Sequence, residues 1–404
     1  MILEKLESRA EWELFLKARS DGGHLTKDEE KELALFIESG EYLHAVRNLL
    51  DGGSFALPEA RQINKRFSEK KRTVFVFPPK DAMVQKMLAH LFLGYDHIFA
   101  DNLYSFRRDM GVKKAISDLR DTPGIAGMYS YKLDVSDYFN SVSVDKLLPL
   151  LGEVLADEPE VYALLERTLR EPCAVVNGEA VEMRKGIMAG SPLSAFLANL
   201  YLRELDAHFA AAGVPYARYS DDIIVFSPTE AELFACRDYI LAFLAERELG
   251  VNEKKVFVTA PGEAWTFLGF SFCGGTFDIA DASVKKIKSK MRRKSRALVR
   301  WKNRKGADGE RAARAFVRYF MRKFFDNGVS GELTWCRWFF PVIDTADSLR
   351  MIDAYMQQCI RYIATEKRTK AQYDFRYDDM KRLGYVPLVR AYYDFVKTGQ
   401  FPSV

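Results

Sequence analysis

Two adjacent carboxylates stand in front of an apolar run in the stretch "RYSDDIIVF". Asp221 and Asp222 follow the short segment "YARY", so the simplest local structure is a strand, a tight turn and a returning strand. Adjacent side chains on a strand point to opposite faces, but a turn can bring both acids toward one point. Taken alone, the pair fits an ordinary acidic hairpin turn better than a site.

A third acid in a similar setting favours chemistry. Asp134 lies in "YKLDVSDYF", also at the expected end of a strand. Three carboxylates from neighbouring strand ends repel one another unless divalent cations lie between them. In-line phosphoryl transfer uses two such ions about 4 Å apart, one activating a 3′-hydroxyl and one stabilising the leaving pyrophosphate. We therefore expect Asp134, Asp221 and Asp222 to be catalytic and to bind two Mg²⁺ ions, with Mn²⁺ as an alternative.

The elements that position these acids fall into three regions. Residues 1–60 have the pattern of short helices, with "DGGHLTKDEE" supplying a glycine stop and Thr26 as a cap. Between residues 61 and 280, strand-like runs such as "RTVFVFPP" alternate with helical ones, which predicts an α+β domain. Within it, "SPLSAFLANLYLRELDAHFAAAG" predicts one long helix that ends at Gly213.

The third region, residues 281–404, is basic and helical. Twelve of the 21 residues from Lys285 to Lys305 are Lys or Arg, and none is acidic. A run of one sign at this density favours a polyanionic partner over a merely solvated helix face. In the next helix, arginines recur every three or four residues, with Phe316 and Phe320 on another face. The residues expected to bind nucleic-acid phosphates are Lys285, Lys286, Lys288, Arg292, Arg293, Arg311, Arg314, Arg318 and Arg322.

Composition narrows the class of protein. The chain has 404 residues and a formal net charge of only +4, so the placement of charge matters more than its sum. Its five cysteines are far apart and form no CxxC pair, which argues against a disulfide framework and a structural zinc site. The first residues are charged, and no segment has the roughly 18 uncharged apolar residues of a membrane span. We expect a cytoplasmic protein without membrane association.

Five motifs together resemble one family. In order and spacing, "LDVSDYF", "GIMAGSPLSAFLANLYL", "YSDD", "NEKKV" and "FLGF" resemble the palm motifs of reverse transcriptases, particularly bacterial enzymes related to those of group II introns and retrons. The upstream segment with "SFR", at Phe106 and Arg107, resembles the fingers. The resemblance covers roughly residues 60–275. It implies a right-hand polymerase fold: fingers and palm with an antiparallel palm sheet in 61–280, then an all-helical basic thumb and C-terminal region.

The resemblance also implies roles for matched residues. The carbonyl of Val135 would join the three acids as a metal ligand. Asp137 and Arg72 would lie along the phosphates of the incoming nucleotide. Phe139 matches the steric gate, a ring under the sugar that excludes a 2′-hydroxyl; its alternative is core packing.

The remaining matches concern the template, the pyrophosphate and the primer. Gly190 and Ser191 would allow close approach to the templating base pair, and Lys255 would assist departure of pyrophosphate. Phe267, Leu268 and Gly269 match the primer grip, a hairpin that holds the primer end.

The chain departs from the family pattern in the segment before "SPLS". Many relatives have "PQG" where this chain has Met188, Ala189 and Gly190, so a glutamine that touches the nucleotide is replaced by Ala189. A usual proline is likewise Ala195. Neither residue is expected to hold a metal, so we expect polymerisation to survive with altered nucleotide selectivity or template preference.

Two further departures bear on the subgroup. At the position of a motif found in retron enzymes, this chain has "VFVTAPGE" instead. Its cysteines offer no Cys/His endonuclease module. The chain therefore most resembles stand-alone bacterial reverse transcriptases, several of which act in defence against phage.

The leading hypothesis is an RNA-directed DNA polymerase that copies a dedicated, structured non-coding RNA, using deoxynucleotides and a DNA primer or product. One alternative is a template-independent or protein-primed polymerase, which the missing glutamine and nineteen tyrosines allow. Another is a non-enzymatic RNA-binding or splicing-assistant protein. The intact acids argue against the last, because an unused cluster of like charges carries a repulsion cost without a gain. The oligomeric state is left open.

Overall fold

The computed structural model divides the chain into two compact units, Met1–Pro261 and Gly262–Val404. The model describes residues 1–64, 71–171, 173–182, 186–325 and 334–403. The expected division at residues 60 and 280 stays a prediction. In the structure, the hairpin that contains "FLGF" belongs to the same compact unit as the helices that follow it.

The first unit opens with a helical layer: α1 (Ile2–Glu7), α2 (Arg9–Asp21), α3 (Lys27–Glu38) and α4 (Glu41–Leu50). The predicted cap at Thr26 is confirmed, since its hydroxyl accepts a hydrogen bond from the Glu29 backbone N–H at 3.2 Å. The Glu29 carboxylate accepts the Thr26 N–H at 2.8 Å in return. The first helix is held against the rest of the unit by the buried carboxylate of Glu158, which accepts the backbone N–H groups of Ile2 and Leu3.

A four-stranded sheet follows, in the order β2-β1-β4-β5. Its strands are β1 (Glu59–Asn64), β2 (Lys71–Val76), β4 (Cys173–Val176) and β5 (Glu179–Glu182). The predicted strand in "RTVFVFPP" is confirmed as β2, and Pro79 begins the next helix, where a missing N–H costs nothing. The helices of this part are α5 (Pro79–Phe92), α8 (Val144–Val154) and α9 (Pro159–Arg170).

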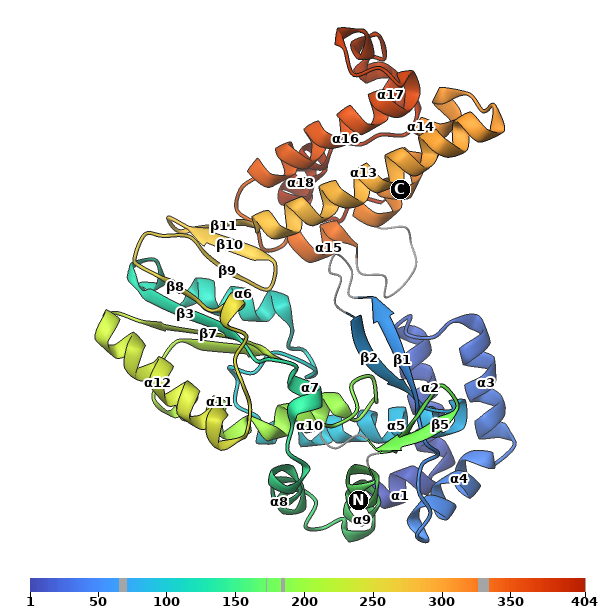
Figure 1. Cartoon of the computed structure of the whole chain (residues 1–404), viewed down its shortest axis with the longest axis vertical. Helices are drawn as coiled ribbons and strands as arrows, with labels where there is room; N and C mark the ends of the chain where they lie inside the picture. The colour runs from blue at the N-terminus through green and yellow to red at the C-terminus, as the bar shows by residue number, and fades with distance from the viewer. Residues whose placement is uncertain (65–70, 172, 183–185, 326–333, 404) are drawn as a thin grey trace. The chain divides into compact units, whose positions relative to one another are not determined.

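The second sheet carries the acids, and all its strand pairs are antiparallel, as the sequence predicts for the palm. Its order is β6-β7-β3-β8, and its strands are β6 (Tyr216–Tyr219), β7 (Asp222–Ser227), β3 (Tyr129–Asp134) and β8 (Phe257–Thr259). The apolar run after Asp222 is completely buried, so side chains on both faces of this strand are covered. A strand with alternating apolar and polar residues would bury only one face. Helix α12 (Glu230–Glu246) packs on β7 and β3, which covers one face of the sheet (Figure 1).

The expectation of a single long helix in "SPLSAFLANLYLRELDAHFAAAG" is wrong. The structure has two helices, α10 (Ser194–Tyr201) and α11 (Arg203–Ala211), separated at Leu202, whose φ of −112° and ψ of 11° leave the helical region. The two helices have different surroundings: α10 is buried nearly all round, whereas α11 is amphipathic. Leu202 is itself completely buried, so core packing rather than a local breaker residue interrupts the helix.

Short elements complete the first unit. They are the α-helices α6 (Val112–Asp121) and α7 (Tyr138–Ser141), and the 3-10 helices η1 (Leu93–Ile98), η2 (Ile125–Gly127) and η3 (Glu253–Lys255). The helix α7 follows directly on the strand end that bears Asp134, and η3 lies beside β3.

The second unit joins a three-stranded antiparallel sheet to a helical bundle. Its strands are β9 (Trp265–Phe267), β10 (Phe270–Cys273) and β11 (Thr276–Ile279). Its helices are α13 (Asp281–Lys305), α14 (Gly309–Phe324), α15 (Trp335–Phe339), α16 (Asp347–Thr365), η4 (Lys370–Asp374), α17 (Tyr377–Arg382) and α18 (Leu388–Thr398). Helix α16 is central, since it packs against α13, α14 and α18. Its buried Asp353 accepts the Leu388 and Val389 N–H groups at 2.9 and 3.0 Å and so caps α18.

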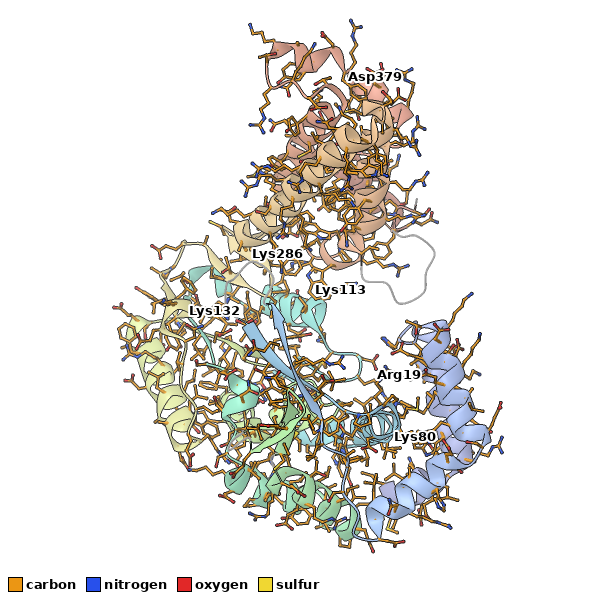
Figure 2. The ribbon with its side chains drawn as sticks, turned by 45° about the vertical axis from the view of Figure 1, so that its right-hand side comes forward. Arg19, Lys80, Lys113, Lys132, Lys286 and Asp379 are labelled. Atoms are coloured by element: carbon orange, nitrogen blue, oxygen red, sulfur yellow. The ribbon has the colours of Figure 1, made fainter. Side chains whose placement is uncertain are left out.

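The predicted amphipathic pattern of α14 is confirmed. Phe316 and Phe320 are completely buried, and the four arginines of the other face are exposed. Basic side chains also extend from α13, with Lys286 near its first turns (Figure 2). Within the described residues, no helix has the length and apolar character needed to cross a membrane.

Candidate active site

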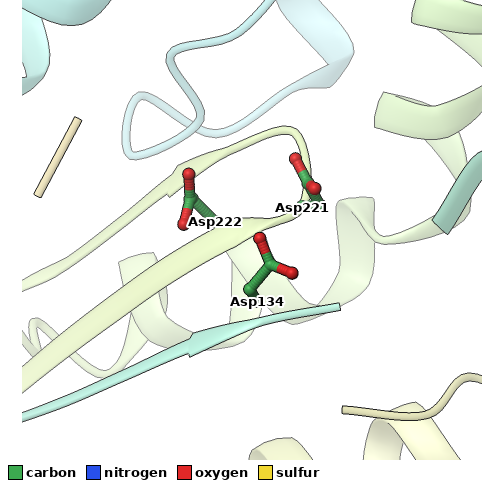
Figure 3. Close-up of side chains that lie close together, drawn as sticks. All are labelled: Asp134, Asp221 and Asp222. Atoms are coloured by element: carbon green, nitrogen blue, oxygen red, sulfur yellow. The ribbon is translucent and has the colours of Figure 1, made fainter. Parts of the chain in front are cut away.

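Asp134, Asp221 and Asp222 converge at one end of the palm sheet (Figure 3). Asp134 ends β3, Asp222 begins β7, and the two residues are direct partners in the strand register. Asp221 lies in the turn between β6 and β7. Each residue offers a carboxylate oxygen, and these oxygens lie within 4.8 Å of one another. The prediction that a turn brings both adjacent acids toward Asp134 is therefore confirmed.

The turn that presents Asp221 is held in an unusual backbone conformation. Ser220 has a φ of 59°, in the left-handed region that non-glycine residues rarely adopt. Both backbone polar groups of Ser220 have buried side-chain partners: its N–H donates to Ser105 Oγ at 2.9 Å, and its carbonyl accepts from Arg218 Nη1 at 3.3 Å. On the other side, the Asp221 carbonyl accepts the Val135 N–H at 2.8 Å. The turn is thus fixed from both sides.

Arg218 is the centre of the network behind the turn. Its side chain is completely buried and donates to the equally buried Asp206, at 2.8 Å to Oδ1 and 2.5 Å to Oδ2. A buried charge needs such a partner, because desolvation of an unpaired ion costs several kcal/mol, of the order of 3–5 when one partner is removed. Tyr216 donates its hydroxyl to Asp206 Oδ1 at 3.0 Å, and Arg218 Nη2 also reaches the Asn199 carbonyl at 3.2 Å.

Ser105 and Asn199 complete this network. The Ser105 hydroxyl donates to Asn199 Oδ1 at 3.1 Å, and the Asn199 amide donates to the Ser105 carbonyl at 2.7 Å. Both residues are buried. We call Ser105, Asn199, Asp206 and Arg218 the turn-supporting network. The network was not predicted from the sequence, although an arginine inside an apolar strand signals a buried acidic partner.

The electrostatics of the three acids is that of a cation site. Burial, followed by the charges of Asp134 and Asp222, raises the pKa of Asp221 above its ordinary value. Burial likewise raises the pKa of Asp222, with Lys132 opposing it. Carboxylate oxygens are the ligands that Mg²⁺ and Mn²⁺ prefer, and a divalent ion would supply the missing positive charge. The donor set therefore fits a divalent metal.

Two lysines offset part of the charge. Lys255, in η3, forms an ion pair with the buried carboxylate of Asp134, although its own side chain is 45% exposed. Lys132, two residues before Asp134 on β3, lies 3.9 Å from Asp222 Oδ1. Sequence analysis singled out Lys255 but missed Lys132, which alternation along β3 places on the same face as Asp134.

Comparison with known proteins places the chain in a family. Residues 63–272, just over half of the chain, match the family model described as reverse transcriptase (RNA-dependent DNA polymerase). The chain belongs to the reverse transcriptase family. With its antiparallel palm sheet and mixed helices and strands, it has the right-hand polymerase fold expected from the sequence.

Solved structures similar to this reverse transcriptase chain include telomerases of Candida tropicalis. The apo enzyme shares 12% identity at a TM-score of 0.49, and covers 82% of this chain and 60% of its own. The apo enzyme truncated from its C-terminal domain shares 13% identity at a TM-score of 0.46, and the match covers 56% of this chain and 55% of that chain. The telomerase in complex with a TWJ fragment of telomeric RNA shares 10% identity at a TM-score of 0.46, and the match covers 82% of this chain and 64% of that chain. The chain thus spans less than two thirds of each telomerase chain.

Three other residues matched to reverse transcriptases follow Asp134 closely in the chain. Val135 is buried, and its peptide is held by flanking backbone bonds from Asn252 to Asp134 and from Ser136 to Gly250. Asp137 is exposed, has a φ of 45° and accepts from the Asn140 amide at 2.9 Å. Phe139 is half-buried. Their roles toward metal, phosphates and sugar stay predictions.

The loop before "SPLS" is packed against β2 of the first sheet. A Cβ on Gly190, whose φ is 104°, would lie 3.1 Å from the Phe75 carbonyl of β2. The close approach observed at Gly190 is thus to protein backbone. The Ser191 hydroxyl donates to Oε1 of the completely buried Gln85 at 2.8 Å. The side chain of Arg72 lies outside the described part of the chain, so its predicted phosphate contact stays a prediction.

The remaining predicted site residues lie in the second unit. Phe267 ends β9 and is completely buried, and Leu268 and Gly269 form the turn to β10 with φ of 51° and 93°. On α13 and α14, eight of the nine basic residues predicted to bind nucleic acid are exposed; Lys288 is half-buried, with Nζ 5.9 Å from the Tyr355 ring. Primer grip and nucleic-acid binding stay predictions.

The raised pKa values give a first test through stability. Because Asp221 and Asp222 bind protons more tightly in the fold than in the unfolded chain, protonation stabilises the metal-free fold. This contribution is present below the ordinary Asp pKa of about 4 and is lost as the pH rises through the raised values. We expect Asp221→Asn to raise the melting temperature of the metal-free protein at pH 7. The rise should be a few degrees for each ~1 kcal/mol added to the free energy of unfolding.

The same experiment includes its own control. Adding Mg²⁺ should raise the melting temperature of the unaltered chain at pH 7, less so at pH 5 where protons compete, and should have little effect on the Asp221→Asn variant. Equal Mg²⁺ responses in both proteins would contradict a cation site at these acids. Asp145→Asn, an exposed acid on α8, serves as the matched change of charge.

The turn-supporting network gives a second test. Ser105→Ala removes the acceptor of the Ser220 N–H, a loss of the order of 1–3 kcal/mol for a buried group. The resulting displacement of Asp221 should lower the turnover number of the proposed nucleotide addition about 10- to 100-fold and raise its Mg²⁺ requirement. Ser220→Ala is the matched control, because both supporting bonds use the Ser220 backbone. Equal losses in the two variants would refute this role for Ser105; melting curves establish that both are folded.

Proposed function

We propose that this chain is an RNA-directed DNA polymerase that adds deoxynucleotides to a 3′-hydroxyl. The observation that carries the proposal is the convergence of Asp134, Asp221 and Asp222 at the end of the palm sheet of a reverse transcriptase family member. Hard carboxylate ligands in this number are what phosphoryl transfer with divalent ions needs. When bound, two such ions would activate the attacking hydroxyl and stabilise the leaving pyrophosphate.

The chain's own residues would position the reaction around the ions. The three acids would hold both ions, and their rigid attachment to β3 and the supported turn reduces the reorganisation that catalysis requires. Lys255 would exchange its ion pair with Asp134 for the pyrophosphate, since its half-exposed side chain can turn toward a new anion. Phe139 would lie under the sugar and exclude a 2′-hydroxyl.

Primer extension tests the proposed activity. With an RNA template, an annealed DNA primer, Mg²⁺ and deoxynucleotides, the chain should yield DNA of template length. The double variant Asp221→Asn/Asp222→Asn should lose synthesis by a factor of 10³ or more, because removing a metal's ligands removes most of the transition-state stabilisation, several kcal/mol. Products independent of template sequence would support a template-independent polymerase instead, and full activity of the double variant would refute the metal assignment.

We further propose that the template is a structured non-coding RNA bound in part by the basic helices. This is supported by the exposed basic residues along α13 and α14 in the second unit. Binding through phosphate contacts of this kind weakens steeply as salt rises. The binding constant falls by roughly one power of the salt concentration for each contact. A bacterial origin and a role in phage defence belong to the same proposal and are supported by the sequence resemblance, and a cytoplasmic location is supported by the scattered cysteines.

Sequencing the nucleic acid that co-purifies with the chain tests the template proposal. A single enriched RNA, with its complementary DNA present only when the three acids are intact, is the expected result. Changing Arg311, Arg314, Arg318 and Arg322 to glutamine should reduce RNA retention and flatten its salt dependence. Recovery of a random sample of cellular RNA would refute a dedicated template.

A further inference from the structure

Phe106 is an exposed aromatic ring on a rigid support beside the catalytic turn. Its side chain is 48% exposed, whereas its neighbours Leu103, Tyr104 and Ser105 are buried. Its φ of 57° is in the left-handed region, which is energetically unfavourable for a bulky residue. The fold therefore holds an apolar ring in solvent at an energetic cost.

The residues on both sides of Phe106 explain how the strained backbone is held. Ser105 is tied to Asn199 and to the Ser220 N–H of the catalytic turn. Arg107 forms a two-pronged ion pair with Asp96, at 2.8 and 3.0 Å, and its side chain is 5% exposed. The "SFR" element thus contains two anchors and one partly exposed ring, and only the ring is available to a ligand.

The position of the ring relates it to the acids. The Phe106 and Tyr219 rings have centroids 6.4 Å apart, and Tyr219 is the direct strand partner of Asp222. Cross-strand partners lie on the same face of a sheet, so Tyr219 links the ring to the metal-binding face. The ring and the turn share one support, because Ser105 precedes Phe106 in the chain and accepts the hydrogen bond of Ser220.

We propose that Phe106 contacts the terminal base pair of the primer and template at the active site, through a base or sugar face. The proposal rests on the proposed polymerase function. A flat apolar ring accepts any base face, which suits a site that must pass every sequence, and such contacts are worth about tenfold in affinity. Because the support is shared with the catalytic turn, the contact sets the primer end relative to the carboxylates.

Photocrosslinking tests the contact without requiring synthesis. The probe is an RNA template annealed to a DNA primer that carries 5-iodo-2′-deoxyuridine at its 3′-terminal position, bound to the Asp221→Asn/Asp222→Asn protein. Near-ultraviolet light links this base to adjacent aromatic side chains, and mass spectrometry identifies the linked residue. We expect a crosslink at Phe106 that is absent when the modified base lies six positions back. Crosslinks only to other residues would refute the proposal.

Affinity and stability together separate a ligand contact from a structural role. Phe106→Ala should weaken primer–template binding about tenfold, Phe106→Trp should retain it, and Leu35→Ala, at a still more exposed apolar residue on α3, should have no effect. Phe106→Gly should weaken binding while holding or raising the melting temperature, because glycine relieves the left-handed strain. Unchanged affinity in Phe106→Ala, or parallel losses of affinity and stability, would overturn the proposal.

The outcomes also distinguish this proposal from the proposed function. A wild-type chain that crosslinks through Phe106 but makes no DNA would contradict polymerase activity and leave the contact intact. A chain that extends primers, and whose Phe106→Ala variant binds and extends them equally well, would overturn the contact alone.

Discussion

The structure depends on holding three like charges together. Asp134 and Asp222 face each other across a strand pair, and Asp221 is added from the turn, so burial and repulsion both oppose ionisation at this point. Only a rigid frame can maintain that arrangement. The frame is the fully buried run of β7, which is packed on both faces, together with the hydrogen bonds that fix the turn. The palm sheet is therefore best understood as a support for electrostatic strain.

The basic side chains near the acids are of two kinds: one buried arginine and two partly exposed lysines. Arg218 lies under the turn, but its charge is matched by Asp206 in a completely buried pair, so it supports the turn without neutralising the acids. Lys255 and Lys132 contact the acids directly, and both have partly exposed side chains that can move away. A cation that enters can displace the partly exposed lysines, whereas it cannot displace a buried guanidinium. This division leaves the carboxylates available to metal.

The sequence was sufficient for features with a local signal. The hairpin around Asp221, the cap at Thr26 and the arginine face of α14 follow from turn chemistry, capping and helical period, which act over a few residues. The break at Leu202 has no local signal, because core packing imposes it. The turn-supporting network was also missed: Ser105 and Asn199 lie 94 residues apart, and neither has an unusual neighbourhood. The expected approach of Gly190 to the templating base pair stays a prediction, and within the protein its close neighbour is the backbone of β2.

Part of the backbone strain lies in loops of the first unit. Non-glycine residues with left-handed φ include Phe106, Asp137, Met188 and Ser220, each in a loop that belongs to the palm or packs beside it. Each of the four is held by hydrogen bonds of its own or of adjacent residues, such as those from Ser191 N–H and Ser194 Oγ to the Met188 carbonyl. Strained residues persist only where the surroundings over-determine them. At Phe106 and Ser220, the turn-supporting network therefore stabilises a backbone geometry that the local sequence would not adopt by itself.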